Sequence, residues 1–75
     1  MQQQGKKYLQ FIGNNIRKKR NELAISQQEL ADNADVAKST IQRIEKGEMN
    51  PSILTLINIS LALEIDLSKL IFLKK

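Results

Sequence analysis

The chain has 75 residues, a net charge of +4, and neither cysteine nor histidine. These absences exclude disulfides, thiolate metal sites and imidazole bases. A chain this small also has no room for a sizeable pocket. We therefore expect that the protein is not an enzyme and that it binds no metal, cofactor or small-molecule ligand. Its apolar runs are far shorter than the roughly 20 residues of a membrane span. No apolar region follows Lys6 and Lys7, so we expect no secretory signal and no membrane partner, but a cytoplasmic protein.

The basic residues are concentrated at the start of the chain. Residues 1–20 hold six basic residues and no acid, whereas residues 21–75 hold six basic residues and eight acids. A localised positive field favours a polyanionic partner, although a solvated helix face has the same composition. Residues 1–7 are polar and rich in glutamine, and we predict a flexible arm there, followed by a single domain over residues 8–75.

The first helix is predicted over residues 8–23, because apolar residues from Leu9 to Leu23 recur at helical spacing. Gly13 weakens this helix by up to ~1 kcal/mol relative to alanine without preventing it. A second helix is predicted over residues 27–33, where Ser26 and Glu29 have the spacing of a capping box.

The following elements are also short helices marked by residues at their ends. Asp35 lies in the turn after the second helix and is one of the few residue types that tolerate a positive φ. Ser52 and Asp66 each precede a predicted helix as its N-cap, and Gly47 ends another. The predicted helices span residues 38–46 before Gly47, residues 53–63 after Ser52, and residues 67–72 after Asp66. No strand pattern is present, so the fold class is all-α.

The helix predicted over residues 38–46 carries a polar stripe opposite Ile41 and Ile44. The stripe consists of Lys38, Ser39, Gln42 and Arg43, which lie on one face at helical spacing. Arginine and lysine can donate to guanine O6 and N7, glutamine can pair with adenine, and serine accepts several bases. We predict that these four residues contact DNA bases in the major groove; the alternative is an ordinary solvated face.

A longer set of residues carries a family resemblance over residues 12–72. The set is Ser26-Gln27-Gln28-Glu29-Leu30-Ala31, Val36, Ser39-Thr40-Ile41, Ile44-Glu45-Lys46-Gly47, Pro51-Ser52, Leu56 and Ala62-Leu63. On these residues the chain resembles the lambda-repressor and Cro type of helix-turn-helix family. The resemblance implies a compact bundle of about five short helices whose third helix enters the major groove of double-stranded DNA. The chain departs from the usual pattern at Asp35, Ala37 and Glu64, where glycine, a serine or threonine cap, and glycine are common.

The resemblance also implies roles outside the polar stripe. It places Gln27 against the DNA backbone, and it joins Arg20 to Glu45 in an ion pair that fixes helix orientation. Other polar residues are expected to contact the DNA backbone or, alternatively, to be only solvated. These are Arg17, Lys18, Lys46 and Asn50. Thr40 borders the polar stripe, and we expect it to contact either a phosphate or a thymine methyl group.

Leu54 and Leu61 are seven residues apart in the fourth predicted helix, on a face that the family usually makes polar. Exposed aliphatic side chains at this spacing indicate a partner surface. We predict a symmetric homodimer through this surface; alternatively, the residues pack onto the chain's own core or cover its N-terminal arm. The predicted interface is extended by Leu67, Leu70, Ile71 and Phe72.

Together these observations predict a sequence-specific DNA-binding transcriptional regulator that acts as a homodimer on a pseudo-palindromic operator. We predict a repressor; activation by contact with polymerase is the physical alternative. Two further alternatives stay open. An antitoxin-like or adaptor module would use the apolar residues to bind another protein and would have little affinity for DNA. A non-specific nucleic-acid binder would depend on Lys6 and Lys7 more than on Arg43.

Overall fold

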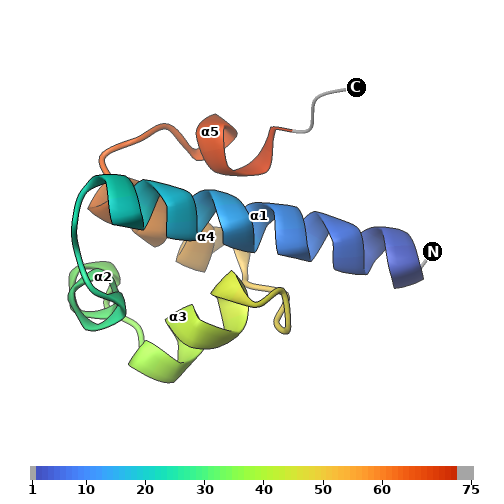
Figure 1. The fold of residues 1–75 in the computed structure, drawn as a ribbon, viewed down its shortest axis with the longest axis horizontal. Coiled ribbons are helices and arrows are strands. Elements are labelled where there is room, and N and C mark those ends of the chain that lie inside the picture. The colour runs from blue at the N-terminus through green and yellow to red at the C-terminus, as the bar shows by residue number, and fades with distance from the viewer. Residues whose placement is uncertain (1, 73–75) are drawn as a thin grey trace.

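Five α-helices follow one another within residues 2–72, the part of the chain that the computed structural model describes, and no strand lies among them (Figure 1). The helices are α1 (Gln2–Glu22), α2 (Gln27–Ala34), α3 (Lys38–Glu45), α4 (Ile53–Ala62) and α5 (Leu67–Ile71). α1 crosses the middle of the fold and contacts α3 on one side and α5 on the other (Figure 1). The all-α fold class is confirmed.

The start of α1 differs from the prediction. The helix begins at Gln2 rather than at Tyr8, so residues 2–7, predicted as an arm, form its first turns. Glutamine and lysine are good helix formers, and only Gly5 opposes them. These turns project beyond the other helices (Figure 1), which explains why apolar periodicity did not detect them. Met1 lies outside the described residues.

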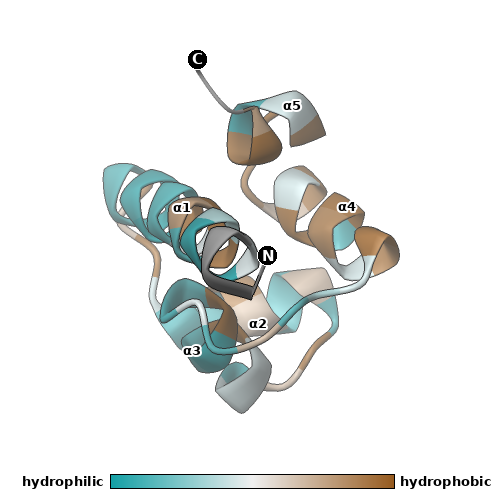
Figure 2. Cartoon of the chain, turned by 90° about the vertical axis from the view of Figure 1, so that its right-hand side faces the viewer, coloured by the Kyte–Doolittle hydropathy of each residue, from teal (hydrophilic) through white to brown (hydrophobic). Residues whose placement is uncertain are grey.

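The core draws on all five helices. Its buried hydrophobic residues are Ile16, Leu30, Ala31, Ala34, Ile41, Ile44, Leu56, Ile59, Leu63 and Leu70. Covering one leucine or isoleucine side chain fully contributes about 1.5–3 kcal/mol, so such a core can stabilise a domain of this size without disulfides. Figure 2 shows that α4 is largely hydrophobic, whereas α1 and α3 are largely hydrophilic.

The predicted dimer surface on α5 is wrong in part. Leu70 is fully buried in the core of its own chain, because α5 folds against α1 and α4. Leu67 and Ile71 are half-buried and pack against the same core. Phe72, which follows α5, is exposed.

The helix ends follow local signals in most places. Ser26 and Glu29 form the predicted capping box, and the Ser52 hydroxyl accepts from the Thr55 amide. Asp66 precedes α5, but its side chain makes no capping hydrogen bond, which corrects the prediction. Positive φ angles are found at Ala24 (58°), Asp35 (58°), Gly47 (73°) and Glu64 (59°). No sequence signal indicated Ala24, where a side chain in this conformation costs roughly 1–2 kcal/mol.

None of the helices within residues 2–72 combines the length and the apolar character needed to cross a membrane.

Candidate nucleic-acid interface

α3 has one buried side and one exposed side. Ile41 and Ile44 are fully buried and hold the helix against its neighbours α1 and α2. The opposite side is exposed, and it carries the predicted stripe of Lys38, Ser39, Gln42 and Arg43. The four side chains therefore lie together at the surface, on a helix whose other side is held by the core.

In the described part of the chain, the stripe has no polar partners. Within residues 5–72, no hydrogen bond or ion pair occupies its four side chains. Other exposed polar residues do pair: Arg17 donates to Asn14 at 2.7 Å and Gln28 donates to Asp32 at 2.8 Å. The donors and acceptors of the stripe are thus available to base edges.

The start of α3 lacks the stabilisation that the starts of α2 and α4 have. Ala37 occupies the N-cap position and provides no capping hydrogen bond, a loss of ~1 kcal/mol relative to serine or threonine. Lys38 adds a positive charge where the helix dipole is already positive, which is unfavourable. A phosphate at this helix end would relieve both defects, because it accepts from amides and neutralises the charge.

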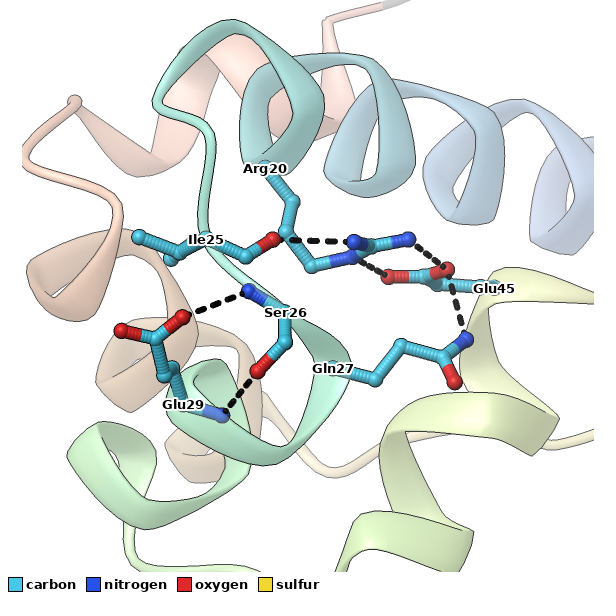
Figure 3. A network of polar contacts seen from close by, with 6 residues as sticks. All are labelled: Arg20, Ile25, Ser26, Gln27, Glu29 and Glu45. Carbon is cyan, nitrogen blue, oxygen red and sulfur yellow. Dashed lines mark hydrogen bonds and ion pairs between the residues drawn. The ribbon is translucent and has the colours of Figure 1, made fainter.

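A network of polar contacts fixes the other end of α3 to α1 (Figure 3). Arg20 donates to both carboxylate oxygens of Glu45, from Nε to Oε2 at 2.7 Å and from Nη2 to Oε1 at 3.1 Å. Its Nη1 donates to the Ile25 carbonyl oxygen at 3.0 Å. The side chains are 13% and 3% exposed, and the hydrogen bonds to Glu45 raise the pKa of Arg20 against the opposing effect of burial. The pair joins the end of α1 to the end of α3.

Gln27 belongs to the same network. It lies in the first turn of α2, and its Nε2 donates to Glu45 Oε1 at 3.1 Å (Figure 3). An amide nitrogen carries two hydrogens, so one is left to donate to a DNA phosphate. The capping box beside it, with Ser26 and Glu29 joined at 2.9 and 3.0 Å, holds the first turn of α2 in place.

The residues predicted to contact the DNA backbone do not all lie together. Lys46 and Asn50 are exposed where α3 ends and in the loop after it, and Thr40 is half-buried beside the stripe. Arg17 is exposed on α1. Lys18 instead borders an open hollow with Ser60 and Asp66, on the side of α1 that faces α5, so it does not join the α3 surface.

Two residues of α1 set its contacts with α3 and α5, and neither was predicted to have this role. Gly13 lets α1 approach the backbone of α3 closely, since a Cβ there would lie 2.8 Å from the Glu45 carbonyl oxygen. Asn15 donates from Nδ2 to the Leu70 carbonyl oxygen at 2.8 Å and attaches α5 to α1. An isolated glycine inside a helical pattern is a signal of close packing; the partner of Asn15 has no local signal.

Two helices joined by a tight turn, the second with an unpaired polar face, define a helix-turn-helix DNA-binding domain. The chain belongs to the lambda-repressor and Cro type of this class: the sequence model of the family HTH_3, described as helix-turn-helix, matches residues 16–70. Comparison with the curated proteins gives no match.

Solved structures of regulators share the fold. The restriction-modification controller protein C.AhdI from Aeromonas hydrophila is 27% identical, with a TM-score of 0.81 over 83% of this chain and 94% of that protein. An HTH_3 family transcriptional regulator from Vibrio cholerae is 29% identical, with a TM-score of 0.83 over 88% of this chain, but this chain spans 37% of its length. The clp gene regulator ClgR from C. glutamicum, at 21% identity and a TM-score of 0.80 over 84% of this chain and 82% of that one, shows the fold alone.

Proposed function

We propose that this protein is a sequence-specific transcriptional regulator whose α3 enters the major groove of DNA. The observation that carries the proposal is the exposed stripe of Lys38, Ser39, Gln42 and Arg43, which is unpaired within residues 5–72 and lies on a helix held by the core and by Glu45. Arg43 has the geometry to donate twice to guanine, and Gln42 can pair with adenine. The regulators of similar structure support the same class of function.

DNA backbone contacts are assigned to residues around the stripe. Gln27, Thr40, Lys46 and Asn50 lie on or near the helix-turn-helix, and Arg17 is the exposed cation of α1 that remains a candidate. Such contacts set the register of the protein on the duplex and make binding depend on salt.

The substitution Arg43→Ala tests the proposal. On a site selected from a random DNA pool, we expect a loss of about 1–3 kcal/mol of binding free energy and relaxed preference at the contacted base. Lys46→Ala is the matched control, because a phosphate contact weakens all sequences alike and lowers the salt slope by about 1. Fluorescence anisotropy across a salt titration measures both. Equal weakening of all sequences by Arg43→Ala would support non-specific binding instead.

We further propose that two copies associate through α4 and act as a repressor. Leu54 and Leu61 are 69% and 70% exposed, and their spacing places them on one face of the helix. A symmetric dimer would present two α3 helices about 34 Å apart to half-sites ~10 bp apart in a pseudo-palindromic operator. Such a dimer, bound over a promoter, would exclude polymerase.

Leu61→Glu is expected to convert this dimer to monomers, because it buries a carboxylate in an apolar interface without a partner. Sedimentation equilibrium measures the change, with Leu23→Glu as the control, since Leu23 is exposed at the end of α1. A dimer that persists in Leu61→Glu would exclude this surface, and a stable complex with a different chain would favour the adaptor function.

A further inference from the structure

All three aromatic side chains of the chain lie away from α3. Tyr8 and Phe11 are on α1, and Phe72 follows α5. On α1, Gly13 meets the backbone of α3, whereas Asn15 donates to α5. Successive helical residues are rotated by about 100°, so Tyr8 and Phe11 share the side of Asn15. We call Tyr8, Phe11 and Phe72 the aromatic surface.

The aromatic surface is incompletely covered. Tyr8 is 48% exposed and Phe72 is 66% exposed, and neither contributes to the buried core. Phe11 and Phe72 border a hollow of about 310 Å³, whose remaining lining residues are Asn15, Ser68 and Lys69. Aromatic side chains contribute most when they are covered, and uncovered ones around a hollow indicate that another molecule completes the packing.

This surface is built by parts of the chain outside the family's common segment. The family match covers residues 16–70. Tyr8, Phe11 and Phe72 therefore lie outside the segment that the family model matches. Their position away from α3 separates them from the proposed DNA contact.

Charge identifies the kind of molecule that fits. Among the described residues, no acid lines this hollow, and the three acids that share another hollow with Lys69 lie in a separate one between α1 and α4. Lys69 lies at the hollow, and Lys7 is exposed one helical turn before Phe11. A second copy facing the same surface would bring like charges together, whereas an acidic partner gains from them.

We propose that the aromatic surface binds an acidic segment of another protein. An apolar side chain of the segment occupies the hollow between Phe11 and Phe72, and neighbouring carboxylates approach Lys7 and Lys69. This function is separate from DNA recognition and leaves the α3 stripe accessible.

A designed peptide of alternating glutamate and leucine with one tryptophan, labelled for fluorescence anisotropy, tests the proposal on the full chain. We expect Phe72→Ser and Lys69→Glu each to weaken its binding at least about fivefold, as loss of an interface hot spot does. Both residues are exposed, so neither change threatens the core. Leu23→Ser and Lys46→Glu, exposed changes elsewhere, should leave peptide binding unchanged, as should Arg43→Ala even if DNA recognition is lost.

Three results would overturn the proposal. Equal binding of a peptide with serine in place of leucine and tryptophan would show attraction of charge alone. Displacement of the peptide by a lower concentration of oligothymidylate, sensitive to Phe72→Ser, would show a surface for single-stranded nucleic acid. Loss of a dimer in Phe72→Ser, measured by sedimentation, would show an interface between copies.

Discussion

Replacing Gly13 by alanine is expected to destabilise the domain by about 2–3 kcal/mol, the effect of overpacking a tight contact. The new Cβ would lie 2.8 Å from the Glu45 carbonyl oxygen and 2.9 Å from its carbonyl carbon. Both are backbone atoms of α3, so no side chain can rotate away, and α3 must move off α1. The higher helix propensity of alanine, about 1 kcal/mol, offsets only part of this loss. Urea denaturation measures the change as a lower midpoint at constant slope.

Gly5→Ala is the matched control for Gly13→Ala. Gly5 lies in the same helix, and a Cβ there would meet nothing within 4 Å. The substitution should therefore stabilise the domain by up to ~1 kcal/mol through helix propensity alone. A neutral or stabilising effect of Gly13→Ala would contradict the prediction, because it would show that a Cβ fits between α1 and α3 at this position.

The helix ends show which features of the fold can be predicted from local sequence. Ser26 with Glu29, Ser52 and Gly47 act through bonds or dihedral angles within a few residues, so their roles could be predicted from local pattern. Apolar periodicity could not locate the start of α1, because its first turns project from the bundle and bury no periodic apolar face. Helix propensity at residues 2–7 was the available signal, and it points to helix rather than to an arm.

The polar stripe of α3 was predictable for the same local reason. Ile41 and Ile44 mark the buried side of the helix, so the opposite side follows from the helical period. The burial of Leu70 was not predictable, because it depends on where α5 meets α1. The bond that sets this contact joins Asn15 to Leu70 across 55 residues of sequence. Lys18 lies on the side of α1 that faces α5, as Asn15 does, and this separates Lys18 from the stripe on α3.

Removing the Glu45 carboxylate by Glu45→Ala is expected to cost about 3–5 kcal/mol, as breaking a buried ion pair does. Arg20 would keep the Ile25 carbonyl as an acceptor but would lose both bonds to Glu45, and the Gln27 amide would lose its partner. A domain of this size is stabilised by roughly 0.05–0.15 kcal/mol per residue, so much of that stability would disappear. Glu48→Ala, an exposed glutamate after α3, is the control and should change the free energy of unfolding by less than about 0.5 kcal/mol.

A double variant separates the stability of the ion pair from its effect on orientation. Arg20→Met with Glu45→Leu leaves no unpaired charge and should recover most of the stability lost in Glu45→Ala. It also removes the acceptor that holds Gln27, so we expect weaker DNA backbone contact despite a stable fold.

The pKa of Arg20 is raised in the folded state, so the stability that its ion pair contributes is fully present below the unfolded-state pKa. That stability is lost only as the pH rises through the folded-state pKa. The stability difference between wild type and Arg20→Met should therefore be the same at neutral and at mildly alkaline pH, and a difference that fell between them would show that another group carries it.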